Sequence, residues 1–187
     1  GETQAEVPPA WFAIDPAAPR PAIPTEPVLG PEQQLISHSL RGGKAPEFGE
    51  SKAAQFTART AEGTELNGRD QKLVYAVPAW PESDFTVRVR VRIKELPQQR
   101  LGQVFCAWAA SMDDPLRLVV EGGKLFARIE AGQVYTTVGA PIEAGSWHAV
   151  AAVKQGETLT LYLDGRAIGS CRVPEFNETR AADCALG

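Results

Sequence analysis

The fold of this chain is decided by the stretch Gly145-Ser-Trp-His-Ala-Val-Ala-Ala-Val-Lys-Gln-Gly-Glu-Thr-Leu-Thr-Leu-Tyr-Leu-Asp-Gly-Arg166. Residues 147–154 are rich in aromatic and β-branched side chains, which favours a strand. Gln155-Gly156 provides a turn, and from 159 to 164 every second residue is leucine. Asp164-Gly165 is a strong turn signal. The stretch therefore predicts a β-hairpin with one apolar face.

A second strand is predicted upstream, where residues 85–94 alternate between apolar and basic side chains. Period-two alternation is typical of a half-buried antiparallel strand. Its apolar face must therefore lie in the core. Its other face carries four cations, which we call the basic ladder: Arg88, Arg90, Arg92 and Lys94.

Other expected strands are short and separated by Gly, Pro, Asn or Asp turns. They cover residues 35–40, 72–77, 102–110, 116–120, 124–130 and 133–138. No segment has helical periodicity. Together these strands predict an all-β protein, built as a two-sheet antiparallel β-sandwich.

The bulk composition limits the organisation and the class of protein. A chain of 187 residues suits one domain, which we place at 34–187. Residues 1–33 hold eight of the 15 prolines and are expected to form an arm or linker, with Trp11-Phe12-Ala-Ile14 as an apolar plug. The net charge of −4 disfavours nucleic-acid binding. No apolar run reaches the length of a membrane span.

The three cysteines allow two interpretations. Cys106 lies in an apolar run and is expected to be a small buried side chain. Cys171 and Cys184 bracket a polar segment and either form a disulfide, which would imply an oxidising compartment, or remain free. No Cys-x-x-Cys spacing indicates zinc.

The predicted hairpin resembles the signature hairpin of laminin-G-like domains, in the concanavalin A-like lectin/glucanase superfamily. The resemblance rests on Trp147-His148-Ala149-Val150-Ala151 and on Leu159-Thr-Leu-Tyr-Leu-Asp-Gly165, with Ala149 where a second His is common. It covers residues 34–187 and implies a jelly-roll sandwich. It also implies one more strand after Leu186-Gly187, so we expect an open sheet edge, covered by the N-terminal arm or completed in a longer chain.

The resemblance raises two chemical expectations. Glucanases of the superfamily carry Glu-x-Asp-x-x-Glu on a strand, and no expected strand here has it, so we expect no enzyme. His148 is expected to be structural. Calcium is the family's commonest cofactor, and the candidate ligands are turn residues: Asp113 and Asp114, with Asn67 and Asp70. For Asp113 and Asp114 the alternative is turn chemistry.

The basic ladder is the strongest functional feature. Four cations on one face repel each other unless an acid or an anion lies opposite. Arginine binds carboxylates through two hydrogen bonds, so the ladder predicts a site for an acidic sugar. A ring for stacking is expected from Tyr135, Tyr162 or Trp108. The alternative is a solvated face whose cations pair with neighbouring acids.

These observations favour a non-catalytic carbohydrate-binding module that is secreted, either extracellular or periplasmic. The resemblance suggests that it belongs to a larger protein, such as a glycoside hydrolase or a sialidase. A structural or protein-binding laminin-G-like module is the first alternative, and a glycoside hydrolase with an unrecognised site is the second. A face with cations and a ring favours carbohydrate binding, and an acid-paired face favours the structural role.

Overall fold

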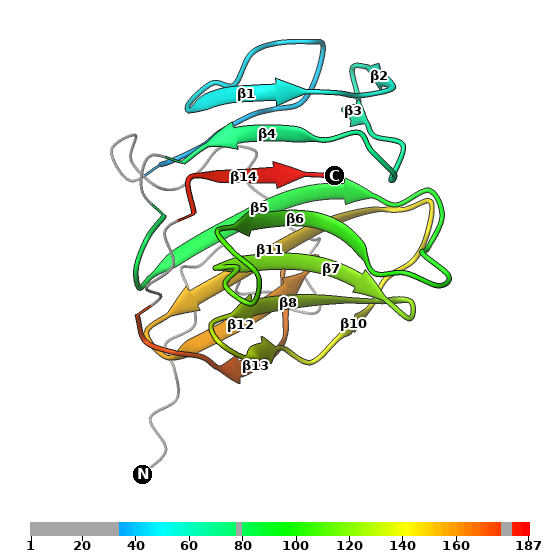
Figure 1. The fold of residues 1–187 in the computed structure, drawn as a ribbon. Helices are drawn as coiled ribbons and strands as arrows, with labels where there is room; N and C mark the ends of the chain where they lie inside the picture. Colours follow the sequence, from blue (N-terminus) through cyan, green and yellow to red (C-terminus); the bar gives the residue numbers. More distant parts are fainter. Residues whose placement is uncertain (1–33, 78–79, 177–180) are drawn as a thin grey trace.

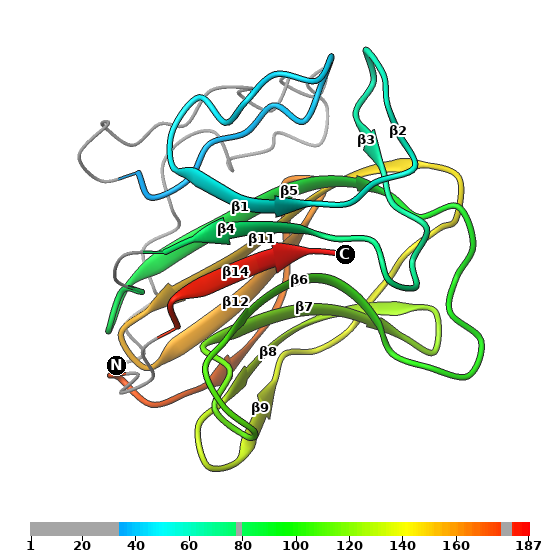
Figure 2. The ribbon, with the colours of Figure 1, turned by 45° about the horizontal axis from the view of Figure 1, so that its top comes forward.

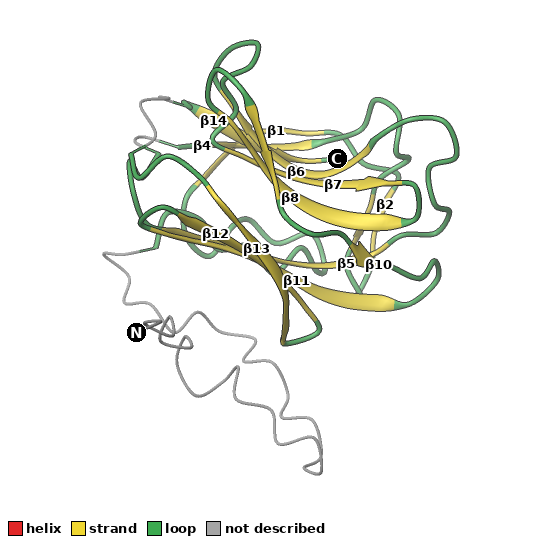
Figure 3. Ribbon diagram, turned by 90° about the horizontal axis from the view of Figure 1, so that it is seen from below, coloured by secondary structure: helices red, strands yellow, loops and turns green. Residues whose placement is uncertain are grey.

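The fold is a sandwich of two antiparallel sheets, seen edge-on in Figure 3. The computed structural model describes residues 34–77, 80–176 and 181–187, and their regular elements are all strands. The larger sheet contains eight: β1 (Glu50–Ala54), β4 (Leu73–Ala76), β14 (Asp183–Leu186), β6 (Gly102–Trp108), β7 (Leu116–Glu121), β8 (Lys124–Glu130), β9 (Val134–Thr136) and β10 (Ala140–Pro141).

The smaller sheet contains four strands, in the order β13 (Arg166–Arg172), β12 (Thr158–Leu163), β11 (Trp147–Gln155) and β5 (Phe85–Arg92). A separate two-stranded hairpin is made by β2 (Ala58–Arg59) and β3 (Thr64–Glu65). Figure 1 shows the two layers behind one another, and the all-β sandwich predicted from the sequence is confirmed.

The predicted hairpin is β11 and β12. Gly156 adopts a φ of 51° in the turn between them, and Asp164 and Gly165 adopt 50° and 77° in the turn that follows β12. Two successive positive φ angles are typical of a type I′ turn, for which Asp-Gly is a preferred pair. The local turn chemistry therefore fixes both ends of β12.

The core lies between the inner faces of the two sheets. Val150 and Ala152 of β11 and the alternating leucines Leu159 and Leu161 of β12 are almost completely buried. They belong to the same cluster as the buried apolar side chains of β7 and β8. Val87, Val89 and Val91 of β5 pack against this cluster, as their alternation predicts.

Three local predictions need correction. Residues 35–40 form no strand and contribute one isolated bridge, from Ser37 to Phe48. Arg166–Arg172, expected to lie in a loop, is the edge strand β13. Asp183–Leu186 is β14, which pairs with β4 and β6 inside the larger sheet (Figure 1, red), so the expected gap at this end of the domain is filled. Short strands of this kind depend on partners distant in sequence.

Of the two interpretations of the cysteines, the structure matches free thiols, because Cys171 and Cys184 are both free, as is Cys106. Cys171 belongs to the edge strand β13 of the smaller sheet, whereas Cys184 lies on β14 in the interior of the larger one. Packed sheets lie about 10 Å apart, and a disulfide requires Cα atoms within about 7 Å. The sandwich therefore separates the two thiols.

The boundary at residue 34 stays a prediction. Residues 1–33, including the Trp11-Phe12-Ala-Ile14 plug, lie outside the described residues. Within the described residues there is no helix long and apolar enough to cross a membrane.

A buried lysine closes one end of the smaller sheet. The Lys154 side chain points into the sandwich and is only 1% exposed. Its ammonium group donates to three backbone carbonyls, at 2.9 Å to Ser83, 2.8 Å to Gly156 and 2.6 Å to Glu175. Burial lowers the pKa of this group, partly offset by Asp84. The ammonium thus ties the start of β5, the β11–β12 turn and the segment after β13 together.

We predict that Lys154→Met lowers the free energy of unfolding by about 2–4 kcal/mol, because it leaves three partly buried carbonyl groups without this donor. Urea denaturation measures the change. Lys124→Met, at an exposed position on β8, is the control and should stay within about 0.5 kcal/mol of the parent. Equal stability of the two variants would show that the three carbonyls do not need the ammonium.

Candidate functional site

Three residues of the basic ladder, Arg88, Arg90 and Arg92, lie on the outer face of the smaller sheet, on its edge strand β5, and Lys94 follows in a bend after the strand. β11 pairs with β5 so that Trp147 lies opposite Arg92, Ala149 opposite Arg90, and Ala151 opposite Arg88. Side chains at directly paired positions point to the same side of a sheet. Because the alternating valines of β5 face the core, this register turns the arginines and Trp147 outward together.

An aromatic ring contacts two of these cations. The guanidinium carbon of Arg90 is 5.1 Å from the centre of the Trp147 ring, and that of Arg92 is 4.9 Å away. Both separations suit cation–π attraction, worth about 0.5–1 kcal/mol at an exposed position. Arg90 and Arg92 are exposed, and Trp147 is half-buried. We call these three residues the Trp147 platform.

The β2–β3 hairpin stands beside the end of β5 (Figure 2) and pairs with two ladder cations. Glu62 contacts Arg92 at 3.2 Å, and Glu65 contacts Lys94 at 2.6 Å. All four side chains are at least 37% exposed, so each pair contributes little to stability. Arg92 and Lys94 therefore match the acid-paired interpretation, whereas Arg90 contacts the Trp147 ring.

The remaining predicted ligand-binding residues do not join the platform. Burial lowers the pKa of Arg88, which is half-buried on the same face. Tyr162 belongs to the smaller sheet but is only 7% exposed, so its ring offers no stacking surface. Tyr135 and Trp108 are on strands of the larger sheet. Trp147 was not among the rings expected from the sequence, although its place at the start of a strand was predicted.

The proposed calcium ligands Asp113 and Asp114 lie in the turn between β6 and β7. Asp114 is 3.7 Å from Arg117, which also contacts Glu130 at 2.9 Å. Burial, followed by the nearby Glu130, raises the pKa of Asp114. A carboxyl group with an arginine partner and a raised pKa suits a divalent cation poorly. Across residues 34–77, 80–176 and 181–187, no three acidic, His or Cys side chains form a metal-binding group. These residues do not fit calcium.

His148 has a structural role. Its Nδ1 donates to Asp164 Oδ2 at 2.9 Å, and Asp164 Oδ1 accepts from the Ala149 amide at 2.9 Å. His148 Nε2 is 3.3 Å from the Glu143 carbonyl oxygen. The Asp164 carboxylate thus joins the Asp-Gly turn to β11, next to Trp147.

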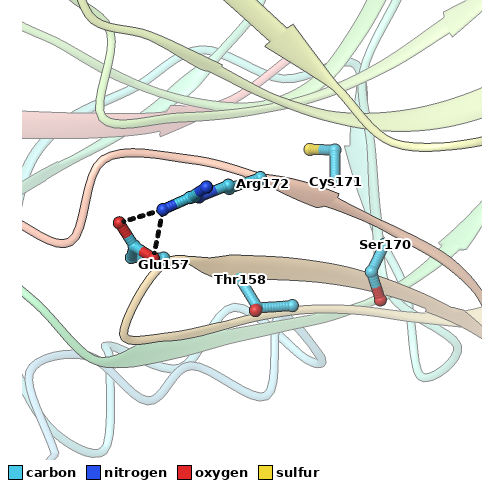
Figure 4. A pocket seen from close by; sticks show the side chains of 5 residues that line it. All are labelled: Glu157, Thr158, Ser170, Cys171 and Arg172. Carbon is cyan, nitrogen blue, oxygen red and sulfur yellow. Dashed lines mark hydrogen bonds and ion pairs between the residues drawn. The ribbon is translucent and has the colours of Figure 1, made fainter. Parts of the chain in front are cut away.

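Figure 4 shows a shallow surface pocket along β13. Arg172 and Glu157 face each other there, with guanidinium to carboxylate distances of 2.9 and 2.8 Å. The Ser170 hydroxyl hydrogen-bonds the Thr160 hydroxyl at 2.8 Å rather than a base. Cys171 also lines the pocket, and burial raises the pKa of its thiol. This geometry provides no activated nucleophile.

Comparison with known proteins places the fold. A family profile described as the concanavalin A-like lectin/glucanases superfamily, of laminin G type, matches residues 67–187. The chain belongs to this superfamily. The match includes all of β4 to β14, and with them the predicted signature hairpin. No curated protein sequence matches the chain.

Solved structures with the same fold share little sequence with this laminin-G-like chain. The receptor-binding domain of botulinum neurotoxin mosaic serotype C/D has a TM-score of 0.66 at 10% identity, covering 84% of this chain and 43% of that one. The botulinum neurotoxin serotype D ligand-binding domain in complex with N-acetylneuraminic acid has a TM-score of 0.63 at 10% identity, with the same coverages. This chain spans less than half the length of these proteins.

A thiol titration tests the arrangement of the cysteines. We predict three reactive thiols per chain in denaturant without reductant. In the native protein, burial raises the pKa of Cys106 and of Cys184 to about 12, so both should react far more slowly than the half-buried Cys171. Ellman's reagent measures both quantities. A single reactive thiol in denaturant, rising to three after reduction, would contradict the free cysteines.

Proposed function

We propose that this chain is a non-catalytic, lectin-like carbohydrate-binding module of a larger secreted protein, and that the Trp147 platform binds an acidic glycan. The observation that carries the proposal is the contact of the Trp147 ring with the guanidinium groups of both Arg90 and Arg92. Sugars stack on aromatic rings, and arginine binds carboxylates and sulfates with two parallel hydrogen bonds. The platform combines both groups on one exposed face.

Two similar structures support the same class of ligand. One is a botulinum neurotoxin serotype D ligand-binding domain in complex with N-acetylneuraminic acid. The other comes from botulinum neurotoxin type C, whose cell entry is dependent upon interaction with two ganglioside molecules. We base the proposal of carbohydrate binding on the residues of the Trp147 platform, because fold alone does not fix function. A parent glycoside hydrolase or sialidase stays part of the proposal.

A structural or protein-binding module is the second candidate. It is favoured by the ion pairs of Arg92 with Glu62 and of Lys94 with Glu65, which already neutralise part of the ladder. The two candidates differ in the role of Arg90. The lectin proposal requires Arg90 for ligand binding, whereas the structural alternative does not.

A glycan array of the folded chain, with calcium and with chelator, tests the proposal. We expect selective binding to acidic glycans, and a loss of at least about tenfold in affinity for Arg90→Glu, because the variant places a like charge beside the ligand. Chelation should leave binding unchanged, since Asp114 is paired with Arg117.

The matched control is Lys124→Glu, which makes the same change in charge at an exposed position on the larger sheet. Equal losses of affinity in Arg90→Glu and Lys124→Glu would assign the effect to net charge. Absence of binding by the folded parent chain would contradict the lectin function and favour the structural alternative.

A further inference from the structure

The β2–β3 hairpin is held on the domain by few contacts. It forms its own two-stranded sheet and lies outside both layers of the sandwich. Its backbone is joined to the preceding segment by the Gly42 amide to the Thr60 carbonyl, at 3.0 Å. The Thr64 hydroxyl donates to the Leu40 carbonyl at 2.8 Å. On the side of the platform, its ion pairs are those of Glu62 and Glu65.

The tip of this hairpin lies against the Trp147 ring. A Cβ atom added to Gly63 would be 3.4 Å from Trp147 Cη2, which is ordinary van der Waals contact. Glu62, the neighbouring residue, reaches Arg92, the cation that stacks on the same ring. The hairpin therefore places a carboxylate and backbone on one end of the surface that we propose for the glycan.

The carboxylates occupy the positions that an acidic ligand needs. Side chains on one face of a strand repeat every two residues, about 7 Å apart, so Arg90 and Arg92 present two neighbouring cations, and Lys94 adds a third just after β5 ends. Glu62 engages Arg92, and Glu65 engages Lys94. Arg90 and Arg92 both contact Trp147 and are both exposed, and Glu62 engages Arg92.

We propose that Glu62 and Glu65 are specificity-determining residues that compete with the ligand for Arg92 and Lys94. The inference rests on the proposed function. With the hairpin closed, a ligand with one acidic group is limited to Arg90 and the ring. A ligand with several acidic groups displaces both carboxylates and gains all three cations. Exposed ion pairs are individually weak, so the exchange costs little.

The test is the double variant Glu62→Gln/Glu65→Gln, which preserves side-chain size and removes the competing charges. Affinities are measured by calorimetry for a sialylated trisaccharide with one carboxylate and for a disaccharide with two sulfates. We expect the double variant to bind the disulfated probe about threefold to tenfold more tightly than the parent chain, and the monoacidic probe with little change.

The matched control is Glu50→Gln/Glu82→Gln, which removes the same charge at exposed positions at the start of β1 and before β5. An equal gain in the control would overturn the proposal, because it would assign the effect to net charge. The proposal would also be overturned if the parent chain binds the probes and the Glu62/Glu65 variant binds both with unchanged affinity. The lectin function would stand in that case.

Hydrogen exchange of residues 56–66 supplies a readout that does not need a ligand. The Thr60 amide donates to the Gly63 carbonyl at 2.8 Å, and the Thr57 amide to the Glu65 carbonyl at 2.9 Å. We expect faster exchange of this segment in the Glu62/Glu65 variant than in the control. Unchanged exchange would overturn the proposal. If neither probe binds any variant, the proposed function fails, and the exchange result still decides whether the carboxylates hold the hairpin.

Discussion

The register between β11 and β5 is the constraint on which the rest of the molecule depends. Eight consecutive residue pairs, from Trp147–Arg92 to Lys154–Phe85, fix which side chains share a face. A shift of one residue would turn every side chain to the opposite face. Arg90 would then replace a valine against the core, and burial of an unpaired charge costs far more than one apolar contact provides. The burial of the β5 valines thus fixes the register that places the arginines and Trp147 on the outer face.

The same strand explains how polar groups are tolerated at the ends of the core. Along its inner face, Val150 and Ala152 lie between His148 at one end and Lys154 at the other. His148 is paired with Asp164, and Lys154 donates to three carbonyl groups. Each polar group is therefore satisfied where the apolar layer ends. The His148–Asp164 pair also fixes the backbone next to Trp147, so the ring begins from a rigid position.

Features with a local cause were predictable from the sequence, and features that depend on distant partners were not. The β11–β12 hairpin and the alternation of β5 follow from turn chemistry and period-two patterns. No strand was predicted around Cys184, because β14 has only four residues and exists through its pairing with β4 and β6. The arginines of the platform were predicted, but the ring was not, because the contact of Trp147 with Arg90 requires the register.

The Trp147 platform and the acid-paired end of the ladder describe one surface that can exchange partners. Arg92 has two neighbours, the Trp147 ring and the Glu62 carboxylate, and its side chain is 37% exposed. Neither neighbour alone contributes more than about 1 kcal/mol at such exposure. Replacing the carboxylate of Glu62 by that of a ligand keeps the cation paired and keeps its contact with the ring. The fold loses no core contact in the exchange, since the apolar layer lies on the opposite face of β5. In our proposal, a ligand can therefore replace Glu62 on this face without lowering the stability of the sandwich beneath it.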